Sequence, residues 1–94
     1  MAQGVVLDFP GGTLDQYDEV IKLMGLKPGG KTPPGGMFHW VTKTDAGIRV
    51  TDVWESREVF DSFAKEKIGP LTAQVGMPEP KIDFYDVHNY LAAG

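Results

Sequence analysis

Runs of β-branched and aromatic residues, separated by segments rich in glycine and proline, predict four strands in this chain. The strands are expected at residues 4–9, 37–43, 47–56 and 81–88. Only a tight turn, Thr44-Asp45-Ala46-Gly47, separates the second run from the third. These two runs are therefore expected to form an antiparallel hairpin.

Two segments between the strands carry the 3.6-residue apolar period of helices. Thr13 and Gln16 have the spacing of a capping box, and Gly25 stands where a left-handed C-terminal cap belongs. A second helix is expected to begin after the N-cap residue Ser56, with an apolar stripe at Val59, Phe60, Phe63, Ala64 and Ile68. Gly69-Pro70 either ends this helix or starts a short new turn that runs to Val75.

The resulting order, βαββαβ, predicts the α+β class and a ferredoxin-like fold. In such a fold a four-stranded antiparallel sheet carries both helices on one face. The 94 residues are expected to form a single domain, 1–94.

Pairing Lys43 with Ile48 across the turn sets the register of the hairpin. His39 then lies opposite Asp52, Val41 opposite Val50, and Met37 opposite Trp54. Because side chains alternate along a strand, the reverse face carries Phe38, Trp40 and Val53. Two helices cover only one face, so the other would expose a large apolar patch. We expect a homodimer that buries this patch face to face.

The net charge and the amino-acid composition argue against several classes of binding partner. The net charge is −4, and the nine Lys and Arg form no basic patch, which argues against nucleic acids and anionic membranes as partners. The chain has no cysteine, so disulfides and thiolate metal sites are excluded. No signal peptide or membrane-spanning run is visible, and the expected location is the cytoplasm.

Residues 25–32, GLKPGGKT, match the letters of a phosphate-binding loop. Such a loop follows a strand and opens a helix, whereas a helix precedes this one and Pro33-Pro34 blocks any helix after it. The segment is therefore interpreted as a connection, and no nucleotide or other cofactor is predicted. Whether residues 27–36 form a lid or a plain connection stays open.

The two histidines and Asp52 are the candidate catalytic groups. A carboxylate beside an imidazole fixes its tautomer, which suits His39 and Asp52 to acid–base chemistry. A purely structural His–Asp hydrogen bond is the alternative. His88 is either a second polar group at the pocket or an ordinary residue at a strand end. A metal site built from these three residues is disfavoured, because no spacing enforces it. Trp54 and Phe63 are expected to form the walls of a substrate pocket, unless they serve only as core.

Residues 52–60, DVWESREVF, resemble the step from the third strand into the second helix in the dimeric α/β-barrel superfamily. The step is typical of its antibiotic-biosynthesis-monooxygenase-like members. Three further segments, residues 5–11, Phe38-His39 and residues 87–91, are similar to those of small bacterial proteins of that superfamily. The resemblance implies a face-to-face sheet dimer with a cavity between sheet and helices in each subunit. It also implies that this cavity hosts cofactor-free oxygenation of aromatic polyketides, haem degradation, lactone isomerisation, cyclisation or plain binding.

The chain departs from the monooxygenase pattern at two positions. Phe63 stands where the second helix often carries a histidine, and Val50 stands where cofactor-free oxygenases use an asparagine. These departures argue against quinol oxygenation. The leading hypothesis is an enzyme that acts on an aromatic or polyketide-like molecule as a monooxygenase, cyclase or isomerase. The alternative is a non-catalytic binding or accessory homodimer.

Overall fold

The computed structural model describes residues 1–93 and contains the predicted order of elements. The two helical segments alternate with the strands, and a π-helical turn, η1, interrupts the second of them. In chain order the elements are β1 (Gln3–Pro10), α1 (Leu14–Leu23), β2 (Gly36–Lys43), β3 (Gly47–Trp54), α2 (Arg57–Phe63), η1 (Ala64–Ile68), α3 (Gly69–Gln74) and β4 (Lys81–Asp86).

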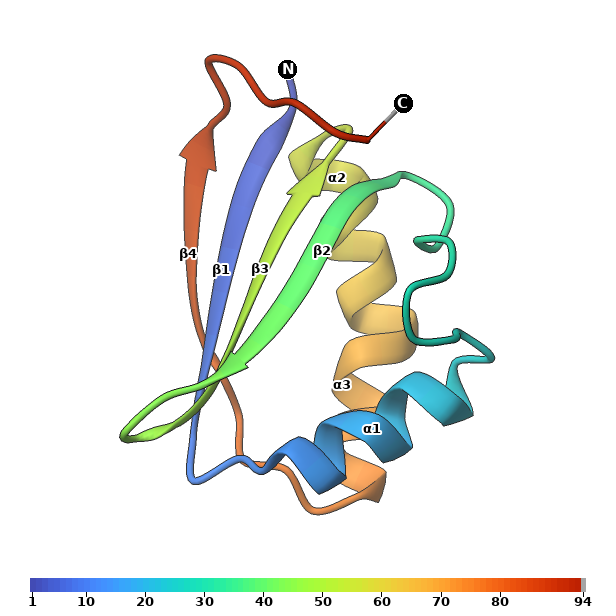
Figure 1. Ribbon diagram of the computed structural model, residues 1–94, viewed down its shortest axis with the longest axis vertical. Coiled ribbons are helices and arrows are strands. Elements are labelled where there is room, and N and C mark those ends of the chain that lie inside the picture. The colour runs from blue at the N-terminus through green and yellow to red at the C-terminus, as the bar shows by residue number, and fades with distance from the viewer. Residues whose placement is uncertain (94) are drawn as a thin grey trace.

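The four strands form one antiparallel sheet in the order β2-β3-β1-β4. Both helical segments and the long connection between α1 and β2 lie on one side of the sheet, and the other side is bare (Figure 1). The predicted α+β, ferredoxin-like fold is confirmed. The sheet order leaves β2 and β4 at opposite edges, which matters for the candidate site.

The ends of α1 are those that the sequence predicts. The hydroxyl of Thr13 accepts a hydrogen bond from the Gln16 amide at 3.1 Å, and the Gln16 side chain accepts one from the Thr13 amide at 3.0 Å. Gly25 has φ +76°, the left-handed conformation that stops the helix.

The second helical segment neither stops nor restarts at Gly69-Pro70, because α2, η1 and α3 follow one another without a break. Pro70 has no N–H to donate to the carbonyl four residues earlier. The helix widens at this point, and the Gly69 amide donates to the Ala64 carbonyl, five residues back.

The hairpin register is the predicted one over most of its length. His39 pairs with Asp52, and Val41 pairs with Val50. The predicted pairing of Met37 with Trp54 is wrong, because a bulge between Gly36 and Phe38 shifts the register and places Gly36 opposite Trp54.

The two faces of the sheet differ sharply in burial. The helix-facing side supplies most of the core, which contains Val5, Leu7, Phe9, Ile48, Val50, Trp54 and, from α2, Phe60. The reverse side exposes Phe38 (43%), Trp40 (49%) and Tyr85 (59%). The two-faced sheet expected from the sequence is therefore present, with large apolar side chains on the side that no helix covers.

Candidate functional site

Asp52 is the buried centre of a chain of polar side chains. Asp52 is only 5% exposed. It belongs to β3, lies on the helix side of the sheet and pairs with His39 of β2. Its Oδ1 lies 2.6 Å from Nδ1 of His39, and its Oδ2 accepts a hydrogen bond from the Trp54 indole N–H at 3.0 Å. A buried carboxylate needs such donors, because desolvation without them is costly.

These contacts fix how the His39 ring is used. An ionised carboxylate only accepts hydrogen bonds, so Nδ1 of His39 carries the proton that faces Asp52. In the neutral ring, Nε2 is then an acceptor. Tyr17 of α1 meets this second nitrogen with its hydroxyl, and the two rings lie nearly parallel, 8° apart, with centroids 5.8 Å from each other.

The Tyr17 hydroxyl is held in its protonated form. Burial, and then the negative charges of Asp52 and Asp18, raise the pKa of Tyr17 to about 12. At neutral pH Tyr17 therefore donates its proton towards Nε2 of His39. We call the four hydrogen-bonded residues Tyr17, His39, Asp52 and Trp54 the polar chain.

The polar chain can accept a proton without leaving an unpaired charge in the apolar core. A proton that arrives at His39 forms an imidazolium directly beside the Asp52 carboxylate, which stabilises it. The His39 side chain is 29% exposed and lies on the edge strand β2, whereas Asp52 is closed off from solvent. Protons can thus enter the chain at the Tyr17–His39 end and not at the Asp52–Trp54 end.

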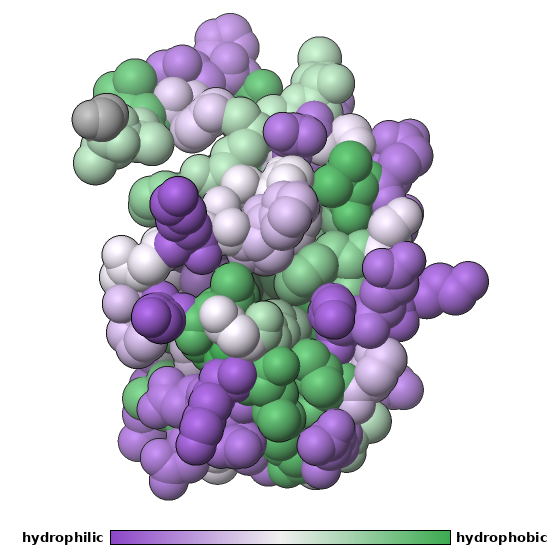
Figure 2. All heavy atoms as spheres, turned by 90° about the vertical axis from the view of Figure 1, so that its right-hand side faces the viewer, coloured by the Kyte–Doolittle hydropathy of each residue, from purple (hydrophilic) through white to green (hydrophobic). Residues whose placement is uncertain are grey.

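An open groove of about 900 Å³ lies between the α1–β2 connection and the helical segment α2–η1. Its wall residues come from the end of α1, from the connection and from one side of α2 and η1. They are Met24, Gly25, Leu26, Lys27, Gly30, Lys31, Thr32, Pro33, Pro34, Glu58, Val59, Ser62, Phe63, Glu66 and Lys67. Figure 2 shows apolar side chains gathered around a hollow on this face of the molecule.

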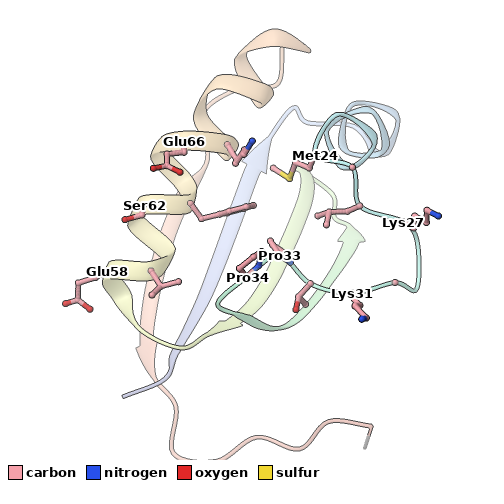
Figure 3. Close-up of a pocket in the computed structure, with 15 residues that line it drawn as sticks. Met24, Lys27, Lys31, Pro33, Pro34, Glu58, Ser62 and Glu66 are labelled. Atoms are coloured by element: carbon pink, nitrogen blue, oxygen red, sulfur yellow. The ribbon is translucent and has the colours of Figure 1, made fainter.

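The groove is apolar inside and charged at its rim. Met24 points towards the interior, whereas Lys27, Lys31 and Glu58 point away from it (Figure 3). The interior therefore suits an apolar or aromatic molecule rather than a nucleotide phosphate. The segment 25–32 contributes to the wall, but no helix follows it to direct amides at a phosphate, since β2 comes next.

Phe63 joins the groove to the polar chain. It lines the groove, and its ring centroid lies 5.0 Å from that of Trp54, which donates to Asp52. Neither His39 nor Asp52 lines the groove. The predicted residues His39, Asp52, Trp54 and Phe63 are thus contiguous, with one aromatic residue, Phe63, at the groove.

His88 lies apart from this cluster. It is exposed and follows β4, whereas His39 belongs to β2 at the opposite edge of the sheet. Among residues 1–93, no three His, Cys, Asp or Glu side chains come together in a group that could hold a metal ion. In the same part of the chain, no helix has the length and apolar character needed to cross a membrane.

Tyr17 is the functional candidate that sequence reasoning missed. Tyr17 stands on the apolar period of α1 and is partly buried against the core. The available signal was its polar hydroxyl, because a buried tyrosine needs a hydrogen-bond partner. The sequence does not say which strand residue would provide it.

Searches for similar proteins gave matches at the level of structure. No family model matches the sequence, and the search of curated proteins found no match. A protein from Chloroflexus aurantiacus described as an antibiotic biosynthesis monooxygenase is similar, with a TM-score of 0.66, 17% identity and full coverage of both chains. One from Deinococcus radiodurans with the same description has a TM-score of 0.56 and 9% identity, over 100% of this chain and 99% of that one.

A variant of SnoaB, a cofactor-independent oxygenase from Streptomyces nogalater, is also similar. Its TM-score is 0.60 at 12% identity, over 98% of this chain and 97% of that one. Sequence identities this low support a shared fold but not a shared chemistry. The resemblance to antibiotic-biosynthesis-monooxygenase-like proteins drawn from the sequence is therefore confirmed for the ferredoxin-like fold of the whole chain.

Proposed function

We propose that this protein is an enzyme that needs no nucleotide cofactor and moves a proton on an aromatic, polyketide-like small molecule. The observation that carries the proposal is the polar chain, in which Asp52 orients His39 and balances the charge that His39 gains. Proton removal from an acidic C–H or phenol O–H is a step that oxygenation, cyclisation and isomerisation of such molecules have in common. The three structural neighbours named above are compatible with this class of chemistry.

The groove provides the seat for the substrate in this proposal. Phe63 and Met24 offer an apolar and aromatic surface, and Phe63 packs on Trp54 at the buried end of the polar chain. A flat, fused aromatic molecule fits such a surface because ring stacking adds to the area that it buries. His39 and Asp52 are proposed as the catalytic pair. Phe63 is proposed as the substrate-binding aromatic residue, and Trp54 supports its ring from the buried side.

The test is proton exchange on an anthrone, whose ring CH₂ is weakly acidic. The compound dithranol is incubated in anaerobic D₂O, and mass spectrometry follows the uptake of deuterium. We expect the wild type to accelerate the exchange, and His39→Ala to lower this acceleration by about 10²-fold or more. Lys65→Ala, an exposed change outside the groove, serves as the control that keeps the rate. Equal rates for the wild type and His39→Ala would remove His39 from the chemistry.

A second candidate function is binding without catalysis. Two observations favour it: His39 and Asp52 do not line the groove, and the polar atoms of the chain satisfy one another. In that case dithranol binds without accelerated exchange. His39→Ala then lowers the melting temperature and leaves binding to the groove intact.

We also propose that the protein works as a homodimer through the bare face of the sheet. Phe38, Trp40 and Tyr85 are between 43% and 59% exposed on this face, and Val53 is half-buried among them. Soluble monomers seldom expose a contiguous apolar patch of this kind. A second copy, with the same patch, buries it by two-fold symmetry. A cytoplasmic location stays a prediction from the sequence.

A further inference from the structure

We infer that Tyr17 is the residue that contacts the substrate and passes the proton to His39. This inference rests on the proposed function and refines its chemistry, because it places Tyr17 between the substrate and the imidazole. The hydroxyl of Tyr17 contacts the His39 ring at the end of the polar chain that is exposed to solvent.

Both ring nitrogens of His39 are already engaged. Nδ1 faces Asp52 at 2.6 Å, and Nε2 faces the hydroxyl of Tyr17. A substrate cannot reach Nε2 while Tyr17 stays in place. The hydroxyl of Tyr17 keeps a free acceptor site even while it donates to His39, since a phenol oxygen both donates and accepts.

The proton transfer balances without any further reactant. The substrate O–H or C–H bond breaks, and its proton forms a bond to the Tyr17 oxygen. In the same step the original Tyr17 proton moves to Nε2 of His39. The products are the substrate anion, a neutral tyrosine and an imidazolium held by Asp52. Return of the proton by the same route resets the chain.

The charges around Tyr17 favour this relay over a standing phenolate. Burial opposes a negative charge on the hydroxyl most strongly, and the charges of Asp52 and Asp18 act in the same direction. A tyrosine that strongly resists ionisation is a poor independent base. It transfers a proton only when it receives one as it gives one away, which is what the contact with His39 allows.

Tyr17 does not line the groove itself, but a molecule in the groove can approach it along α1. Met24, the residue that caps the C-terminal end of α1, follows Tyr17 by seven residues. The two therefore lie on the same helix face, separated by about 10 Å along the axis. Met24 is part of the groove wall, and both residues are partly buried. A fused three-ring aromatic is about as long as two helical turns. It can therefore rest on Met24 at one end and approach Tyr17 with the other.

The test uses alizarin, a three-ring phenol whose colour reports its ionisation. The dye is bound to the wild type, Tyr17→Phe, His39→Ala and Tyr90→Phe, and its absorption is followed as a function of pH. We expect the wild type to raise the acid dissociation constant of the bound dye about tenfold, because the proton passes to His39. Tyr17→Phe should abolish this increase while the dye still binds. Tyr90→Phe removes an exposed hydroxyl in the C-terminal segment and should behave as the wild type.

The variants separate failure of the relay from failure of the proposed function. If His39→Ala abolishes the increase and Tyr17→Phe keeps it, the dye reaches His39 directly and the relay is wrong, whereas the proposed function survives. If the wild type does not bind the dye, or binds it without a change in its ionisation, both are wrong. Unchanged far-ultraviolet circular dichroism of Tyr17→Phe establishes that the variant is folded. If Tyr17→Phe does not fold, Tyr17→His is the second variant, because its ring keeps a polar atom.

Discussion

At the scale of single residues, the hydroxyl of Tyr17 couples the site to the stability of the fold. The pKa of Tyr17 is raised from 10.0 to about 12 in the folded protein. A tyrosine with a raised folded-state pKa contributes stability that is present below pH 10 and is lost as the pH rises towards 12. In this pH range the Tyr17 hydroxyl loses its proton in the unfolded chain but keeps it in the folded chain.

We predict that the stability advantage of the wild type over Tyr17→Phe shrinks between pH 10 and pH 12. Other groups titrate in the same window, but they are common to both proteins and cancel in the difference. The measurement is the melting temperature of both proteins at a series of pH values from 8 upwards. A difference that stays constant across this window would contradict the assignment of the raised pKa.

The carboxylate of Asp52 is expected to matter more for stability than any surface acid. Asp52→Asn turns an acceptor of two hydrogen bonds into a neutral amide that also presents donors to His39 and Trp54. We predict a loss of about 2–3 kcal/mol in the free energy of unfolding, measured in urea.

Asp61→Asn is the matched control, because Asp61 forms an exposed ion pair with Arg57 at 3.5 Å. Its expected cost is below about 0.5 kcal/mol. Similar costs for the two variants would mean that the Asp52 contacts are not a stabilising part of the core.

Sequence reasoning could find half of the polar chain. Register arithmetic places His39 opposite Asp52, since both belong to one hairpin with a short turn. It could not find Tyr17, because that contact depends on how α1 crosses the sheet and on which turn of the helix meets β2. Trp54 and Phe63 were expected as pocket walls. Only Phe63 lines the groove, while Trp54 is buried behind it and supports Asp52.

At the scale of elements, the connection between α1 and β2 is held against α2 at one glycine. Gly35 has φ +85°, and a Cβ atom there would overlap Cγ1 of Val59, a residue of the groove wall. Only glycine meets both demands at this position. The end of the connection is therefore fixed by packing and not merely slack.

We predict that Gly35→Ala costs more than the strain of its backbone alone. Gly29→Ala is the matched control, because Gly29 also has a left-handed φ, +70°, but no atom lies within 4 Å of its would-be Cβ. The control should lose about 1 kcal/mol, and Gly35→Ala about 1–3 kcal/mol more. The additional Val59→Ala change should recover part of that extra cost. Equal stability of the two alanine variants in urea would show that the Gly35–Val59 contact is loose.

The elements themselves follow from local signals, but the departures from the regular pattern depend on tertiary packing as well. Capping residues and apolar periods set α1 and the start of α2, and these signals act over four or five residues. The bulge beside Met37 and the π-helical turn at Ala64–Ile68 are different. The bulge adds one residue to a strand, and the π-helical turn adds one residue to a helix. Tertiary packing decides whether the fold tolerates the extra residue.

At the scale of the whole molecule, the bare sheet face governs assembly. We predict that Trp40→Glu gives a monomer in sedimentation velocity, because a charge at a 49%-exposed apolar position of this face opposes burial in a dimer. Leu23→Glu is the control. It places the same charge at a 41%-exposed apolar position of α1 and should leave the dimer intact. A monomeric wild type would contradict the homodimer.

The protonation state of His39 with a phenol bound shows whether a proton passes from the ligand to this ring. The chain has two histidines, so nitrogen NMR of imidazole-labelled protein gives two sets of signals, and the exposed His88 serves as an internal reference. With alizarin bound near neutral pH, we expect both nitrogens of His39 to become protonated while His88 is unchanged. A His39 ring that keeps an unprotonated Nε2 in the complex would show that no proton reaches it, and would contradict proton transfer as the function of this site.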